Sequence, residues 1–148
     1  MIDHEICHNI LSESERNALL TLVKTKVYNI GKEFPGLQSK PDLHLYPPTY
    51  PLLMKIEELL SRKCEIKKCW ANYSTGNYTS WHTHPGTFSV VYMVQNKSGL
   101  GPWLKNDTET LKTKCPENSF IRFENTLNHT APAANYNIDR YSVAVEFE

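Results

Sequence analysis

The second half of the chain is patterned for β-strands. From Cys64 onward, short segments rich in aromatic and β-branched residues are separated by Gly, Asn, Asp and Pro. This spacing is typical of antiparallel sandwiches and barrels, in which each short strand is followed by a turn. We predict strands near residues 65–73, 88–95, 101–105, 119–124, 127–132 and 140–147.

The last of these segments shows the clearest alternation. Every second residue is apolar, whereas the intervening residues begin with a cation and a hydroxyl. Successive side chains of a strand point to opposite faces, so one face packs and the other offers polar groups to a pocket. The apolar set is Tyr141, Val143, Val145 and Phe147, and the other set is Arg140, Ser142, Ala144 and Glu146.

The first third of the chain is patterned for helices and loops. Ser12 followed by Glu15 has the form of a capping box, which predicts a helix over residues 12–26. Thr49 is a candidate cap for a second helix, with Pro51 in its first turn. Two helices followed by a series of strands predict a mainly β (α+β) fold with N-terminal helices packed on one sheet.

Length, charge and composition narrow the class of protein. A chain of 148 residues makes one domain, in which we expect residues 1–63 to support a core formed by residues 64–148. Sixteen basic residues balance sixteen acidic ones, so a dedicated nucleic-acid-binding protein is not expected. The sequence contains no run of about 18 apolar residues, so we predict no transmembrane helix. The N-terminus has no secretory-signal pattern and the four cysteines have no CxxC spacing, so we expect a cytoplasmic protein with reduced thiols.

Three of the six histidines form a pattern that suits a metal ion. His82 and His84 are separated by one residue at the start of a predicted strand, where alternation places both on one face. Pro85 and Gly86 follow the pair and predict a rigid turn at the mouth of the barrel. His129, from a distant strand, can complete the site. The alternative is that these are ordinary polar loop residues, because an isolated His-x-His pair often arises by chance.

Arg140 and Ser142 predict a receptor for a carboxylate. They are two residues apart on the last predicted strand and therefore point to the same side. A guanidinium group beside a hydroxyl binds a carboxylate well, because its paired N–H groups match the two carboxylate oxygens. The alternative is a surface arginine on an edge strand.

Together these residues resemble the core of the iron(II)/2-oxoglutarate-dependent oxygenases, most closely the prolyl 4-hydroxylase-like branch. That branch has a tyrosine, a glycine three residues later and a first metal-binding histidine nine residues after the tyrosine, which Tyr73, Gly76 and His82 match. His129 matches the second metal-binding histidine, and Arg140 matches the basic residue that follows it. The region around His82 is also similar to small oxygenases found in phage and marine bacterial genomes. The resemblance covers roughly residues 64–148.

The resemblance implies a double-stranded β-helix (jelly-roll, cupin-like) core. It also implies a dioxygenase that hydroxylates a C–H bond while 2-oxoglutarate is decarboxylated to succinate. In this interpretation His82, His84 and His129 are the catalytic, metal-binding residues for Fe²⁺, and Arg140, Ser142 and Tyr73 bind the cosubstrate 2-oxoglutarate.

His84 departs from the family pattern, which has Asp or Glu at this position. Three interpretations stay open: iron held by three histidines, a His84 that does not bind, or a protein that has lost oxygenase chemistry. The substitution removes one negative charge from the metal ligands, and three neutral imidazoles also suit zinc.

Three functions therefore compete. The first is an active iron(II)/2-oxoglutarate oxygenase. The second is a non-catalytic, cupin-like module that binds a metal or a small acid, and the third is a three-histidine zinc enzyme. We expect a small-molecule or peptide substrate, no membrane and no nucleic acid as partners, and a homodimer is one way to cover exposed sheet edges.

Overall fold

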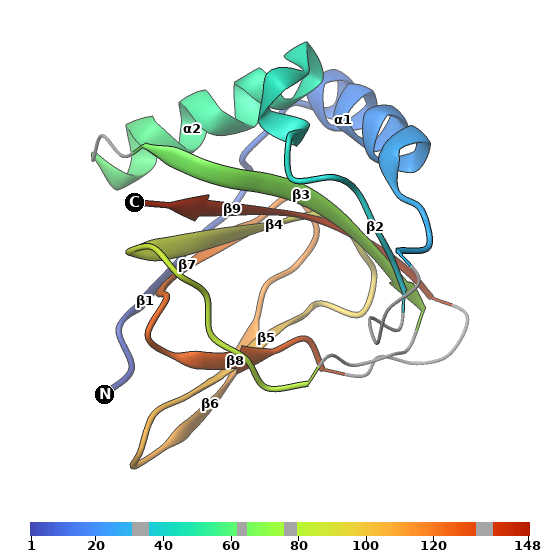
Figure 1. The fold of residues 1–148 in the computed structure, drawn as a ribbon. Coiled ribbons are helices and arrows are strands. Elements are labelled where there is room, and N and C mark those ends of the chain that lie inside the picture. The colour runs from blue at the N-terminus through green and yellow to red at the C-terminus, as the bar shows by residue number, and fades with distance from the viewer. Residues whose placement is uncertain (31–35, 62–64, 76–79, 133–137) are drawn as a thin grey trace.

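The chain folds as two facing β-sheets with two helices on the outside of the larger one (Figure 1). The computed structural model describes residues 1–30, 36–61, 65–75, 80–132 and 138–148. The helices are α1 (Glu13–Lys26) and α2 (Tyr50–Leu60), with short 3₁₀ turns at Leu43–Leu45 and Pro47–Thr49. The strands are β1 (His4–Cys7), β2 (Leu37–Gln38), β3 (Ile66–Thr75), β4 (Phe88–Asn96), β5 (Leu100–Lys105), β6 (Thr110–Lys114), β7 (Phe120–Glu124), β8 (Asn128–Thr130) and β9 (Asp139–Phe147).

The two sheets are joined as in a double-stranded β-helix. The six-stranded sheet has the order β1-β7-β4-β9-β3-β2, and the three-stranded sheet has the order β6-β5-β8. An antiparallel bridge between His82 and His129 adds a fourth segment beside β8. From β3 onward, the chain therefore crosses between the large and the small sheet repeatedly before it ends in β9, at the centre of the large sheet. The predicted fold class is confirmed.

The helices cover the outer face of the large sheet because that face is apolar. On β4 the outward residues are Phe88, Val90, Tyr92 and Val94, which are at most 1% exposed. The same core includes α1 and α2 residues and the odd-numbered residues of β9 from Val143 onward. The helical members of this core include Leu19, Val23, Leu52 and Ile56, and other strands add Cys69, Ala71 and Phe120.

The inner face of the large sheet is divided between a second core and a cavity. Met93, Leu104, Ile121 and Phe123 pack between the two sheets at one end. The even-numbered residues of β9 point to the same inner side, as the alternation predicts, and three of them line the cavity. The strand therefore separates a packing face from a polar face.

The helix starts differ in how they are capped. Ser12 and Glu15 form the predicted capping box: the Ser12 hydroxyl accepts from the Glu15 N–H at 3.2 Å and Glu15 accepts from the Ser12 N–H at 2.9 Å. Thr49 occupies the predicted N-cap position of α2, with Pro51 in the first turn, but its side chain makes no cap hydrogen bond. Its hydroxyl instead donates to the Leu43 carbonyl at 2.9 Å, in the preceding 3₁₀ segment.

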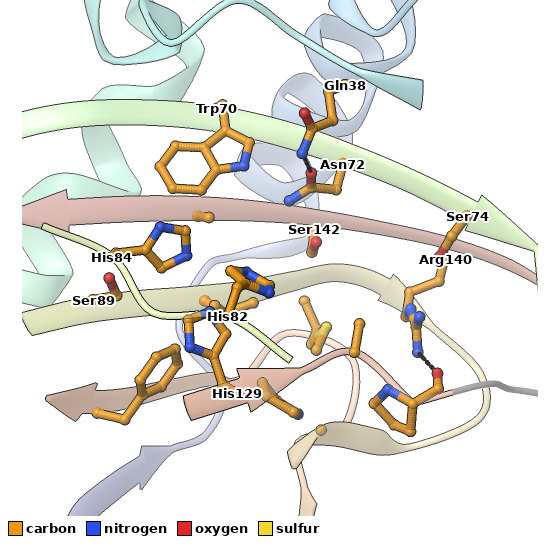
Figure 2. Close-up of a pocket in the computed structure, with 18 of the residues that line it drawn as sticks. Gln38, Trp70, Asn72, Ser74, His82, His84, Ser89, His129, Arg140 and Ser142 are labelled. Carbon is orange, nitrogen blue, oxygen red and sulfur yellow. Dashed lines mark hydrogen bonds between the residues drawn. The ribbon is translucent and has the colours of Figure 1, made fainter. Parts of the chain in front are cut away.

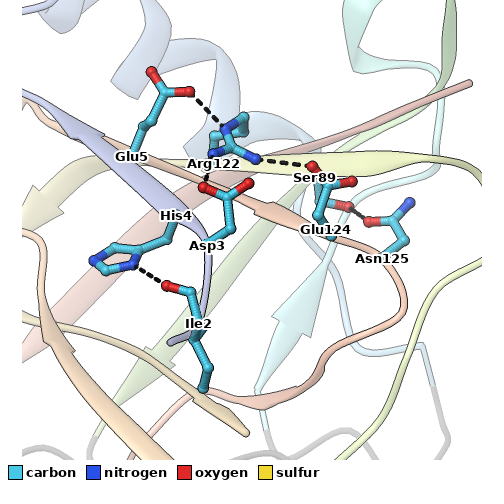
Figure 3. A network of polar contacts seen from close by, with 8 residues as sticks. All are labelled: Ile2, Asp3, His4, Glu5, Ser89, Arg122, Glu124 and Asn125. Atoms are coloured by element: carbon cyan, nitrogen blue, oxygen red, sulfur yellow. Dashed lines mark hydrogen bonds and ion pairs between the residues drawn. The ribbon is translucent and has the colours of Figure 1, made fainter. Parts of the chain in front are cut away.

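Two edge strands come from the N-terminal third, which was predicted to hold only helices and loops. β1 pairs with β7, and β2 pairs with β3. The buried Arg122 of β7 contributes to holding β1 in place, because its guanidinium contacts Asp3 at 3.1 Å, Glu5 at 3.0 Å and Glu124 at 2.9 Å (Figure 3). No helix in the described part of the chain is long and apolar enough to span a membrane.

Candidate metal and carboxylate site

The three predicted histidines meet at one end of a cavity of about 280 Å³ between the sheets (Figure 2). Their nitrogen ligand atoms all lie within 4.8 Å of one another. The main chain brings them together: the His82 N–H donates to the His129 carbonyl at 3.1 Å, and the His129 N–H donates to the His82 carbonyl at 2.9 Å. The His84 N–H donates to the Asn125 carbonyl at 3.4 Å.

Oxygen acceptors near Nδ1 set the orientation of the rings. The Nδ1 of His82 lies 2.7 Å from the Ser80 carbonyl, and that of His129 lies 3.4 Å from the Leu127 carbonyl. A carbonyl only accepts, so Nδ1 of each ring carries the proton and Nε2 keeps a lone pair for a metal. The Nδ1 of His84 faces a carboxylate instead, with the Glu146 Oε2 at 3.7 Å.

Burial keeps two of the imidazoles neutral. Desolvation, and secondarily the neighbouring His82 ring and Lys68, lower the pKa of His84 to about 4. Desolvation, followed by the His82 and His84 rings, lowers the pKa of His129 to about 3. A metal binds the neutral form of imidazole, so near pH 7 these two rings need lose no proton before they bind an ion.

The turn after His84 is fixed by Asn125 and by a glycine. The Asn125 amide donates to the Pro85 carbonyl at 2.7 Å. The Asn125 side-chain oxygen accepts from the Ser89 hydroxyl at 2.5 Å (Figure 3). Gly86 has φ +92°, and a Cβ there would lie 2.6 Å from the Phe147 carbonyl oxygen. The rigid turn predicted at this position is therefore present, and it packs against the end of β9.

Arg140 and Ser142 lie on the cavity face of β9, and Arg140 is set apart from the histidines (Figure 2). Arg140 is 6% exposed, and its Nη1 donates to the Pro132 carbonyl at 3.2 Å. Burial lowers its pKa from the ordinary value, but a guanidinium stays charged at any physiological pH. The cavity therefore has neutral ligands at one end and a buried cation toward the other.

Tyr73 does not line this cavity, so its predicted role as a cosubstrate-binding residue needs correction. Neighbouring Asn72 and Ser74 of β3 line the cavity, and alternation turns Tyr73 to the opposite face. Its ring lies 4.8 Å from that of Tyr141, and its hydroxyl donates to Asp139 at 2.8 Å. That hydrogen bond, with a smaller contribution from burial, raises its pKa to about 12. Gly76, the next residue of the matched motif, lies outside the described residues.

The sequence analysis missed an amide pair in the cavity wall. The Gln38 amide donates to the Asn72 side-chain oxygen at 2.7 Å, and both residues line the cavity (Figure 2). Asn72 lies two residues after Trp70, which also lines the cavity, so strand alternation could have identified it. No pattern could have identified Gln38, because β2 is only two residues long. The rest of the wall includes Ser74, Ser80, Ser89, Val91, Met93, Phe123, Ala131, Pro132 and Ala144.

The donor set fits a divalent transition-metal ion. Imidazole nitrogens bind such ions at about 2.0–2.1 Å, so neighbouring ligands in a facial or tetrahedral set lie roughly 3.0–3.4 Å apart. The ligand atoms here lie within 4.8 Å of one another, so the rings turn inward by about 1–2 Å to hold an ion. Three histidines suit zinc, and a facial set of three ligands with open positions suits non-haem iron. The buried guanidinium of Arg140 fits the carboxylate of a small acid.

Comparison with known proteins supports the fold assignment. No family model matches the chain, and no curated protein sequence matches it either. Solved structures do match. A prolyl hydroxylase from Trichoplax adhaerens, in complex with a hypoxia inducible factor peptide, has a TM-score of 0.72 and 15% identity, over 97% of this chain and 82% of that one.

Two further structures carry ligands of interest. The viral collagen prolyl hydroxylase of Paramecium Bursaria Chlorella virus-1, in complex with 2-oxoglutarate, has a TM-score of 0.69 and 13% identity, over 97% of this chain and 94% of that one. HygX of Streptomyces hygroscopicus, with nickel, 2-oxoglutarate and hygromycin B bound, has a TM-score of 0.75 and 8% identity. The match covers 99% of this chain and 82% of that one. The chain therefore has the fold of the 2-oxoglutarate/iron(II) oxygenases, prolyl hydroxylases included.

Proposed function

We propose that this protein is an iron(II)- and 2-oxoglutarate-dependent oxygenase. The observation that carries the proposal is the pairing of two sites within one cavity: three converging imidazoles and, farther along the same inner wall, the buried guanidinium of Arg140. A cosubstrate with a metal-binding keto acid at one end and a carboxylate at the other needs both. Solved structures of the same fold hold 2-oxoglutarate.

The residues of the chain have separate roles in this proposal. His82, His84 and His129 hold the metal, and Arg140 pairs with the far carboxylate of 2-oxoglutarate, with Ser142 beside it. When bound, iron(II) and 2-oxoglutarate supply the chemistry that oxidises a substrate C–H bond and yields succinate and carbon dioxide. The apolar residues of the cavity wall exclude water around the metal.

The charge of the metal and its ligands explains how a histidine can replace Asp or Glu at position 84. Three neutral imidazoles leave a divalent ion with its full charge of two, and the 2-oxoglutarate dianion matches that charge. A carboxylate ligand would leave the ion with one positive charge. The histidine at position 84 therefore favours an anionic cosubstrate.

The substrate is proposed to be a small molecule or a peptide. The neighbouring structures include one with a peptide and one with hygromycin B, and the net charge of +0 gives no reason to expect nucleic acid. We further propose a cytoplasmic location, which the free thiols of Cys7, Cys69 and Cys115 support. A homodimer stays a prediction, which sedimentation would test.

The first experiment is an anaerobic titration of metal-free protein with Fe²⁺ and 2-oxoglutarate. We expect a visible metal-to-keto-acid charge-transfer band that His129→Ala abolishes and Arg140→Ala weakens. His8→Ala is the matched control, because this histidine is exposed and contacts Ser119 at 2.8 Å, away from the cavity.

Two outcomes would contradict the proposal. No band, together with tight retention of zinc, would favour the three-histidine zinc enzyme. A band without conversion of 2-oxoglutarate to succinate in air, across peptide and small-molecule candidates, would favour the binding module.

A further inference from the structure

Glu146 is a buried carboxylate on the cavity face of β9 that the proposed function leaves unused. Its residue is 1% exposed, and its Oε1 has no hydrogen-bond partner among the described residues. Burying a carboxylate away from water is costly unless a donor or a cation faces it. Its place beside the site therefore needs an explanation.

The side chain faces His84. The Glu146 Oε2 lies 3.7 Å from the Nδ1 of the neutral His84 ring, slightly beyond hydrogen-bond distance. Its two cross-strand neighbours are Lys68 on β3 and Ser89 on β4. The Ser89 hydroxyl is already committed, because it donates to Asn125, and the Lys68 residue is exposed.

The three histidines differ in the group that faces their Nδ1 atoms. The Nδ1 atoms of His82 and His129 face main-chain carbonyls, which fix their rings. His84 has Glu146 in the equivalent place. Histidines that bind metals commonly donate their other N–H to a carboxylate, which orients the ring and makes it a stronger ligand.

We propose that Glu146 is a positioning residue for the metal site: its carboxylate accepts a hydrogen bond from the Nδ1–H of His84 and directs Nε2 toward the ion. Because the carboxylate lies one layer behind the ligands, it makes His84 a stronger ligand and leaves three imidazoles on the ion. The inference rests on the metal site of the proposed function but not on its cosubstrate. The free Oε1 allows the carboxylate to turn toward His84 without breaking an existing hydrogen bond.

Direct binding of the metal by Glu146 is the competing interpretation. The group of side chains whose ligand atoms share one site contains the three histidines and not Glu146. The carboxylate instead faces the Nδ1 of His84, which leaves the Nε2 of that ring for the metal. The geometry therefore favours an indirect role.

The test is the affinity of the whole protein for Co²⁺ alone, measured from its visible spectrum by competition with a chelator. We expect Glu146→Gln to weaken Co²⁺ binding roughly 10- to 100-fold, and Glu146→Asp, which keeps the charge, to recover part of that loss. Glu148→Gln is the matched control: it removes a nearby carboxylate that contacts Lys67 rather than the site, and it should change affinity less than twofold.

The His84→Ala variant tests whether Glu146 affects Co²⁺ binding through His84. If Glu146 acts through His84, Glu146→Gln will cause no further loss there, whereas a direct ligand would cause the same loss in both backgrounds. The melting temperature of the metal-free Glu146→Gln variant should be equal to or above that of the wild type, because a buried, poorly paired charge is removed.

Each result separates this inference from the proposed function. Unchanged Co²⁺ affinity in Glu146→Gln, or equal losses with and without His84, overturns the role of Glu146. A wild-type protein that binds no Co²⁺ overturns it together with the metal site. Co²⁺ binding that depends on Glu146, without a charge-transfer band from Fe²⁺ and 2-oxoglutarate, overturns the oxygenase proposal alone. Should Glu146→Gln not fold, the His84 Nδ1 proton in the Zn²⁺-loaded wild type is the second readout: a strongly downfield NMR signal supports the hydrogen bond, and its absence overturns it.

Discussion

His82 and His129 are held together by hydrogen bonds between their main chains. Each N–H donates to the carbonyl of the other, at 3.1 and 2.9 Å, and their ring centroids lie 4.2 Å apart. Side-chain substitution leaves this pair of hydrogen bonds in place. Variants of the rings therefore report on ligand chemistry rather than on assembly of the two segments.

Metal binding should stabilise the protein through these rings. A ligand that binds only the folded state adds about 2.7 kcal/mol to the free energy of unfolding when its concentration is 100 times Kd. We expect this gain for the wild type with Co²⁺ or Zn²⁺ and none for His129→Ala, measured by chemical unfolding with and without the metal. His8→Ala should keep the full gain, and a His129→Ala protein that still gains would remove this residue from the ligand set.

The stability of the metal-free protein should fall as the pH drops below about 6.5. The pKa values of His84 and His129 are lowered from 6.5 to about 4 and about 3. Between these values and 6.5 the unfolded chain binds more protons than the folded one, so stability rises with pH and is complete above 6.5. Each histidine contributes at most about 1.4 kcal/mol per pH unit in this window. Glu146 acts in the opposite sense, because burial raises its pKa.

Urea unfolding with a chelator present, from pH 4.5 to 7.5, would measure this slope. The double variant His84→Gln/His129→Gln lacks both titrating rings and should lose most of it. A slope that is the same in wild type and double variant would show that other groups cause the pH dependence.

Tyr73→Phe should leave 2-oxoglutarate binding nearly unchanged. The Tyr73 hydroxyl donates to Asp139 on the face of β3 that points away from the cavity, so its loss removes an exposed hydrogen bond worth about 1 kcal/mol or less. Calorimetric titration of the Zn²⁺-loaded protein gives the affinity, and Arg140→Lys, which keeps the charge but not the fork, should weaken it about tenfold or more. An equal loss in Tyr73→Phe would restore the role that the resemblance implies.

The difference between Tyr73 and Arg140 shows how far sequence reasoning reaches. β9 has one apolar and one polar set, so its alternation fixed in advance which side Arg140 and Ser142 face. β3 mixes the two: Trp70, Asn72 and Ser74 face the cavity, whereas Cys69, Ala71 and Tyr73 face the helices or the sheet edge. Aromatic and small residues occur on both faces of β3, so the sequence pattern does not indicate which face Tyr73 occupies.

Other parts of the site depend on contacts between distant segments, which local patterns do not contain. The histidine cluster was predictable because its spacing matched a known family. Glu146 stood in the polar set of β9, but its relation to His84 exists only once the turn after His84 packs against the end of that strand. Gln38 reaches the cavity from a two-residue strand, too short to leave a periodic signal.

The turn that places His84 offers a matched pair of glycine substitutions. Gly86 and Gly99 both have positive φ, +92° and +71°, so alanine is strained at either position by about 1–2 kcal/mol. A Cβ at Gly99 meets nothing within 4 Å, whereas one at Gly86 would lie 2.6 Å from the Phe147 carbonyl oxygen. Main chain must move to relieve that clash, which adds roughly 1–3 kcal/mol.

We therefore expect Gly86→Ala to lower the free energy of unfolding clearly more than Gly99→Ala does, in urea titrations of the metal-free proteins. Because Gly86 lies two residues after His84, the Gly86→Ala substitution should also weaken Co²⁺ binding, whereas Gly99→Ala should not. Equal losses of stability in the two variants would mean that the turn yields easily. Normal Co²⁺ affinity in Gly86→Ala would mean that the position of His84 does not depend on the turn packing against β9.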